Sequence, residues 1–98
     1  MPEVWFKVQW PDGSSSVCYS PSTVIERYFA EGQRYTMRSF LQAARPALEA
    51  ASRRVEARYG YRCSSADDQL ATIEETAKKI GFETPGDITI VYVGRTPP

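Results

Sequence analysis

The chain has 98 residues, of which 42% are hydrophobic and 24% are charged, and its twelve basic residues balance twelve acidic ones. This length and composition predict one globular domain and exclude an intrinsically disordered protein. The zero net charge excludes a global field that would hold nucleic acid or an anionic membrane. No apolar run approaches the roughly 18 residues of a membrane helix, and the start lacks a signal-peptide pattern, so we expect a cytoplasmic protein.

The N-terminal segment predicts a β-hairpin. Residues 3–10 alternate between two faces, as a half-buried strand does, and one face carries Val4, Phe6, Val8 and Trp10. The sequence Pro-Asp-Gly at 11–13 favours a turn, and residues 14–19 follow as a second strand. The serines of this second strand indicate an edge strand with one exposed face.

Two helices are predicted in the middle of the chain. Ser20-Pro21 is a suitable helix start, so we expect a short helix over residues 21–29. A second, long helix is predicted from its cap at Thr36 to Tyr59, where a glycine follows as its stop. Pro46 lies inside this helix and should distort it. Apolar residues recur there every three or four positions and predict one buried stripe: Leu41, Ala44, Leu48, Ala51 and Val55.

A third helix and a last strand complete the predicted elements. Ser64 or Ser65 can cap a helix over residues 65–80, with acidic residues in its first turn and a glycine after its last. Its predicted buried stripe is Ala66, Leu70, Ile73, Ala77 and Ile80. Residues 87–93 form a nearly continuous apolar, β-branched run, which predicts a well-buried strand beside the first one.

The element order β-β-α-α-α-β predicts a two-layer α+β fold, with a three-stranded sheet and helices packed on one face. We expect a single domain over residues 1–93 and a frayed tail over residues 94–98. The sheet face that the helices leave uncovered favours a homodimer.

The two cysteines, Cys18 and Cys63, are candidate reactive thiols, which we expect to be reduced rather than joined in a disulfide. Cys18 shares a strand face with serines and can also be a small core residue. Cys63 is the better candidate, because it lies beside Arg62 and just before a helix N-terminus, a setting that lowers a thiol pKa. The alternative, that Cys63 is a residue that packs at the helix entry, is the more common role for a cysteine at such a position. The chain has no histidine, and two cysteines alone make no zinc site, so we expect no metal and no cofactor.

A basic segment lies between acidic flanks. Residues 34–62 hold seven arginines against two glutamates, a net charge of +5, whereas residues 1–33 sum to −2 and residues 63–98 to −3. Arginine suits carboxylate and phosphate partners, so this segment is a candidate binding surface, represented by Arg45, Arg53, Arg54, Arg58 and Tyr61. The alternative is a solvated helix face laced by ion pairs such as Glu49–Arg53. Nucleic-acid binding is disfavoured by the neutral total charge.

Several motifs together resemble a family of small bacterial nitrogen-starvation response proteins, which are encoded in gene clusters around a nitrilase. The resemblance spans about residues 1–93 and rests on WPDG (10–13), CYSPS (18–22), Tyr28, Gly32, AASRRV (50–55), YG (59–60), CS (63–64) and QLATIE (69–74). For chemistry, the resemblance points to Cys18, Tyr19, Ser20, Pro21, Cys63 and Gln69. Most of these positions also have a structural interpretation as a strand end, a helix cap or a helix start.

The resemblance implies a cytoplasmic accessory protein, more a binding module than an enzyme, with a protein partner from the same gene cluster. It brings no catalytic residues with it. The alternative function is a small-molecule binder or weak enzyme that uses the thiol of Cys63.

Overall fold

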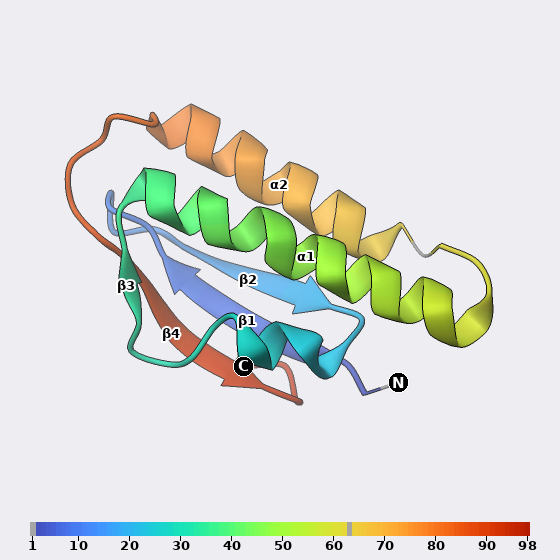
Figure 1. The fold of residues 1–98 in the computed structure, drawn as a ribbon. Helices are drawn as coiled ribbons and strands as arrows, with labels where there is room; N and C mark the ends of the chain where they lie inside the picture. The colour runs from blue at the N-terminus through green and yellow to red at the C-terminus, as the bar shows by residue number, and fades with distance from the viewer. Residues whose placement is uncertain (1, 63) are drawn as a thin grey trace.

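The structure is a computed structural model that describes residues 2–62 and 64–98, and Figure 1 shows it as a sheet covered by helices. Its elements, in chain order, are β1 (Val4–Gln9), β2 (Ser15–Ser20), the 3₁₀ helix η1 (Thr23–Arg27), β3 (Arg34–Tyr35), α1 (Met37–Tyr59), α2 (Ser65–Ile80) and β4 (Ile88–Gly94). The predicted α+β class is confirmed. None of the helices in the described residues is long and apolar enough to cross a membrane.

The strands form one antiparallel sheet in the order β2-β1-β4-β3. The last strand therefore pairs with the first, and the serine-rich β2 lies at an edge, as predicted. The prediction of three strands was wrong, because β3 adds a fourth through the pairs Arg34↔Thr89 and Tyr35↔Ile88. A two-residue strand is too short to show an alternating pattern, so the sequence carried no signal for it.

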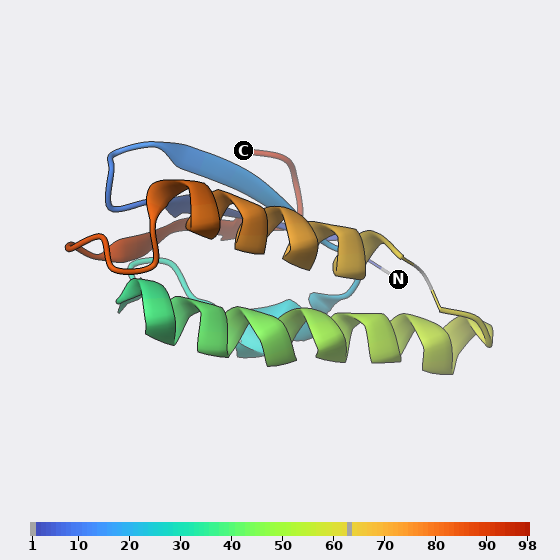
Figure 2. The same cartoon turned by 90° about the horizontal axis from the view of Figure 1, so that it is seen from above.

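One face of the sheet forms the core with the helices, which all lie on that side (Figure 2). Val4, Phe6 and Val8 of β1 are fully buried and pack in one cluster with α1 residues such as Phe40 and Leu48. No described helix covers the opposite face, where only the C-terminal segment turns back and Thr96 accepts a hydrogen bond from Tyr92 (2.6 Å), so β4 is less buried than predicted. Its Val91 is 41% exposed, and only Ile88 and Ile90 are fully buried.

The predicted helix over residues 21–29 is instead the short 3₁₀ helix η1, so residues 2–62 and 64–98 form two α-helices and not three. Its cap is Ser22, whose Oγ accepts a hydrogen bond from the N–H of Val24 (3.2 Å). Ser20 remains in β2, and its hydroxyl donates to the carbonyl oxygen of Ser22 (2.8 Å). Serine side chains that bond nearby backbone groups compete with the regular α-helical pattern, which explains the tight turn.

Helix α1 follows its prediction closely. The Oγ1 of Thr36 accepts from the N–H of Ser39 (3.1 Å), and Gly60 ends the helix in the left-handed conformation at φ 80°. All five residues of the predicted stripe are buried. The helix continues unbroken through Pro46, which lies on the exposed side, where water can satisfy the carbonyl left without a donor.

Helix α2 lies beside α1 and next to the edge strand β2 (Figures 1 and 2). Its bounds match the prediction, and Ala66, Ile73 and Ala77 are its buried residues, while Leu70 and Ile80 are half-buried against the core. Alanines at these positions let the two helices approach closely.

Candidate functional site

Of the two candidate thiols, the structure describes Cys18. Cys18 lies on the core side of β2 and is fully buried, and burial raises the pKa of its thiol to about 12. A thiol with such a pKa is almost entirely protonated at neutral pH and is a poor nucleophile. Cys63 lies outside the described residues.

The CYSPS and QLATIE motifs meet at the edge of the sheet. The backbone N–H of Tyr19 in β2 donates to Oε1 of Gln69 in α2 (2.9 Å), although the two residues are 50 positions apart. The hydroxyl of Tyr19 donates to Glu3 (3.0 Å), and its ring lies edge-on to Trp5 at 5.6 Å. Ser20 and Ser22 are buried and bonded to each other as described above. These motif residues therefore hold β2, η1 and α2 together.

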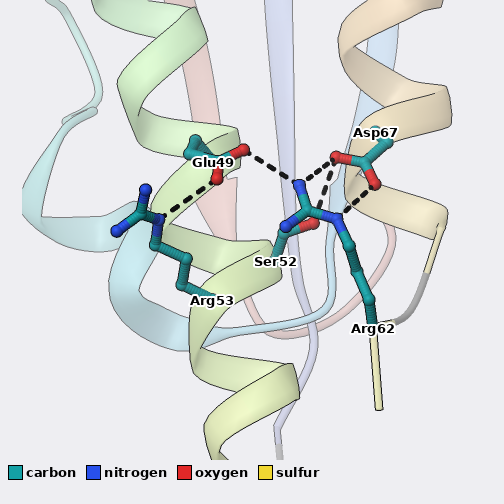
Figure 3. A network of polar contacts seen from close by, with 5 residues as sticks. All are labelled: Glu49, Ser52, Arg53, Arg62 and Asp67. Carbon is teal, nitrogen blue, oxygen red and sulfur yellow. Dashed lines mark hydrogen bonds and ion pairs between the residues drawn. The ribbon is translucent and has the colours of Figure 1, made fainter.

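A network of five polar side chains closes the end of the α1–α2 hairpin (Figure 3). The guanidinium of Arg62 donates to both oxygens of Asp67 (3.0 and 2.9 Å) and to Glu49 (2.9 Å). Ser52 donates to Asp67 (3.2 Å), and Arg53 donates to Glu49 (3.1 Å). The predicted Glu49–Arg53 pair is thus present.

Charge in this network is mutually stabilised. The hydrogen bonds from Arg62, and then those from Arg53, lower the pKa of Glu49 below its ordinary value. Those from Arg62 likewise lower the pKa of Asp67. Both carboxylates in turn raise the pKa of Arg62. Carboxyl groups that are held ionised in this way are poor proton donors at neutral pH. The role of the network is therefore structural, because its hydrogen bonds link α1 to α2.

The candidate arginines of α1 fall into two groups. Arg45 donates to Glu74 of α2 (3.0 Å), and Arg53 pairs with Glu49. Arg54 and Arg58 are exposed and have no carboxylate partner among the described residues. Of the other arginines, only Arg27 of η1 also lacks a carboxylate partner among the described residues. The remaining six each form an ion pair: Arg34, Arg38, Arg45, Arg53, Arg62 and Arg95.

The C-terminal end of α1 extends past the sheet in both views of the fold (Figures 1 and 2). There Tyr59 and Tyr61 are 48% and 68% exposed, and their ring centroids lie 6.4 Å apart. Arg58 precedes them on the last turn of α1. We refer to Arg58, Tyr59 and Tyr61 as the hairpin tip. It includes two of the five predicted binding-surface residues.

A hollow of about 250 Å³ lies between η1 and α1, one turn before the hairpin tip. Thr23, Val24, Glu26 and Arg27 line it from η1, and Arg54 lines it from α1. Sequence reasoning missed Arg27, because it lies outside the basic segment at 34–62 and no periodicity links positions 27 and 54. Among the described residues, no group of three or more cysteine, aspartate or glutamate side chains is placed to hold a metal ion.

A second hollow, of about 420 Å³, lies where α1 begins and α2 ends. Leu41 and the exposed ring of Phe82 form its apolar part, and Arg38 and Arg45 flank it. Arg38 pairs with Glu83 at 3.6 Å and Arg45 pairs with Glu74, so the arginines of this hollow already have carboxylate partners.

Comparison with known protein families identifies a match. A family model described as nitrogen starvation-induced protein NitG matches residues 5–93, a range that includes the sheet, η1 and both α-helices. Neither a curated protein nor a solved structure matches the chain.

Proposed function

The chain belongs to the family of nitrogen starvation-induced protein NitG, and from this membership we propose that it is a non-enzymatic accessory protein of the nitrogen starvation response, which binds another protein in the cytoplasm. The partner we propose is the nitrilase, or another enzyme, encoded in the same gene cluster.

The observation that carries this proposal is the hairpin tip. Tyrosine and arginine are enriched at protein interfaces, because both offer a large contact area together with hydrogen-bond donors. At the tip, two exposed tyrosine rings lie 6.4 Å apart beside Arg58. The tip projects beyond the sheet, so a partner can reach it without displacing any described element (Figure 1).

The protonation states of the thiol and of the carboxyl groups favour a binding function over a catalytic one. Burial raises the pKa of Cys18, which suppresses the thiolate that a nucleophile needs. The carboxyl pKa values of Glu49 and Asp67 are lowered by Arg62, which removes them as general acids near neutral pH. These groups have structural roles instead: Cys18 packs in the core, and Glu49 and Asp67 help to join α1 to α2.

The test is a binding titration of the purified chain against purified proteins of its gene cluster, with the nitrilase first. The double variant Arg58→Glu/Tyr61→Ala should weaken binding at least about tenfold, since it removes two contacts of the kind that dominate interfaces. Arg38→Glu makes the same charge change near the other end of α1, where its existing ion pair is long at 3.6 Å, and serves as the matched control. No binding by any cluster protein, or equal loss in both variants, would refute the proposed surface.

A further inference from the structure

The hollow between η1 and α1 concentrates positive charge that the chain itself leaves uncompensated. Arg27 and Arg54 both line it, and neither pairs with a carboxylate of the described residues. Glu26 also lines it, but that carboxylate already accepts two hydrogen bonds from Arg95 (3.2 and 3.3 Å). Counting these four side chains, the hollow and its margin carry two more positive charges than negative ones.

The two arginines come from separate elements, each anchored in the core. Arg27 follows Ile25, which is fully buried, on an η1 turn capped by Ser22. Arg54 lies beside the buried Val55 on α1. Because both elements are anchored in the core, their backbones keep the two arginines, which repel each other, at one small hollow.

A like charge on α1 adds to that repulsion. Arg58 follows Arg54 by one helical turn, and like charges four residues apart on a helix destabilise it slightly. An anion seated between Arg27 and Arg54 would reduce this repulsion.

We propose that this hollow binds the phosphate group of a small phosphorylated molecule, with Arg27 and Arg54 as its two cationic contacts. Each guanidinium presents a planar fork of N–H donors, which matches the oxygens of a phosphate. The hydroxyl of Thr23 lines the same hollow and can donate a further hydrogen bond.

The rest of the lining indicates what can lie beside the phosphate. A volume of about 250 Å³ leaves room for a few atoms beside the phosphate, and Val24 offers them an apolar contact. A nucleic-acid strand would need an extended basic surface, whereas here the charge is confined to one hollow of a neutral chain. The ligand class is therefore a small phosphate monoester.

The inference is independent of the protein partner proposed above. Arg27 is not part of the hairpin tip, so Arg27→Gln should leave partner binding unchanged, and Tyr61→Ala, which keeps the charge of Arg58, should leave phosphate binding unchanged. Failure of one proposal is thereby distinguishable from failure of the other.

The test is a titration of the full chain, followed by backbone amide NMR shifts, with inorganic phosphate, glycerol 3-phosphate and succinate at constant ionic strength. We expect shifts centred on residues 23–27 and 54, and glycerol 3-phosphate should bind more tightly than inorganic phosphate. Arg27→Gln and Arg54→Gln should each raise the dissociation constant at least about tenfold, since each removes charge-assisted hydrogen bonds. The matched control is Arg53→Gln, which changes the neighbouring residue, already paired with Glu49.

Four results would overturn the proposal: no saturable shift with either phosphate compound, an unchanged dissociation constant in Arg27→Gln, an equal loss in Arg53→Gln, or tighter binding of succinate than of both phosphates. The amide spectrum of each variant reports at the same time whether its fold is intact.

Discussion

Arg62 fixes the end of the helical hairpin by binding one carboxylate on each helix. Its guanidinium lies 2.9 Å from oxygens of Glu49 on α1 and of Asp67 on α2. A lysine could not reproduce this arrangement, because the planar fork of arginine serves both carboxylates at once. A single exposed ion pair contributes little to stability, whereas a bidentate network contributes more. We therefore expect Arg62 to stabilise the fold more than the other charged surface residues do.

Arg62→Met should destabilise the protein at neutral pH, and the difference from the unchanged chain should shrink in acid. Arg62 lowers the folded-state pKa of Glu49 and Asp67, so the stabilisation is complete above their ordinary values of 4.5 and 3.8 and is lost as the pH falls through the lowered values. Urea unfolding at a series of pH values measures this difference. A difference that stayed constant down the acid range would show that Arg62 acts through packing alone.

Cys18 should be unreactive in the folded protein. In a Cys63→Ser variant the only thiol left is Cys18, which is fully buried and whose pKa is raised to about 12 by that burial. We expect a disulfide reagent at pH 7.4 to detect no free thiol in the folded variant and one thiol per chain after denaturation. Rapid labelling of the folded variant would contradict the placement of Cys18 in the core.

At the level of elements, Gln69 of α2 protects the exposed edge of the sheet. An edge strand carries backbone N–H and C=O groups that can pair with another chain. The side chain of Gln69 satisfies one of them, the N–H of Tyr19 in β2, at 2.9 Å. The same hydrogen bond attaches α2 to the sheet, and it joins two elements that are far apart in sequence.

Gln69→Leu should therefore weaken the attachment of α2 to β2. Removing the acceptor leaves a partly buried N–H without its partner, which should lower the free energy of unfolding by about 1 kcal/mol. Amide hydrogen exchange at Tyr19 should accelerate in the same variant. Gln42→Leu, at an exposed position of α1, is the control, and an equal effect there would mean that the hydrogen bond has no special role.

The elements that could be predicted from sequence are those with local signals. The caps, stripe and glycine stop of α1 lie within one continuous segment, and its bounds matched the prediction. The segment of η1 was predicted as an α-helix, because the pattern did not include the local hydrogen bonds of Ser20 and Ser22 that favour a 3₁₀ turn. The two-residue β3 depends on its pairing with β4, so no pattern revealed it. The same holds for the arginines: their number was evident, but which ones lack a partner depends on Glu74 in α2 and on Arg27 in η1.

At the scale of the whole molecule, the sheet has one face without a covering layer (Figure 2). Val17 and Val91 are 54% and 41% exposed there, and the half-buried rings of Trp5, Tyr19 and Tyr92 lie on the same face. Lys7 lies between them, since it is paired with Val17 of β2 and with Tyr92 of β4, and the hydroxyl of Tyr92 donates to the carbonyl oxygen of Thr96 (2.6 Å). Exposed aliphatic and aromatic side chains gathered on one face mark interaction sites in small proteins. We therefore retain the expectation of a homodimer that uses this face.

Val17→Lys should disrupt that dimer without unfolding the chain. The side chain of Val17 is already exposed on the edge strand β2, so lysine can reach water in the monomer, but in a dimer it would bury a charge. Sedimentation velocity over a range of concentrations should show a dimer for the unchanged chain and a dissociation constant raised at least about tenfold for the variant. Gln42→Lys adds the same charge on the helical layer and should leave the dimer intact. A monomer at all concentrations, or equal weakening by both variants, would contradict association through the open face and leave that face to a different protein.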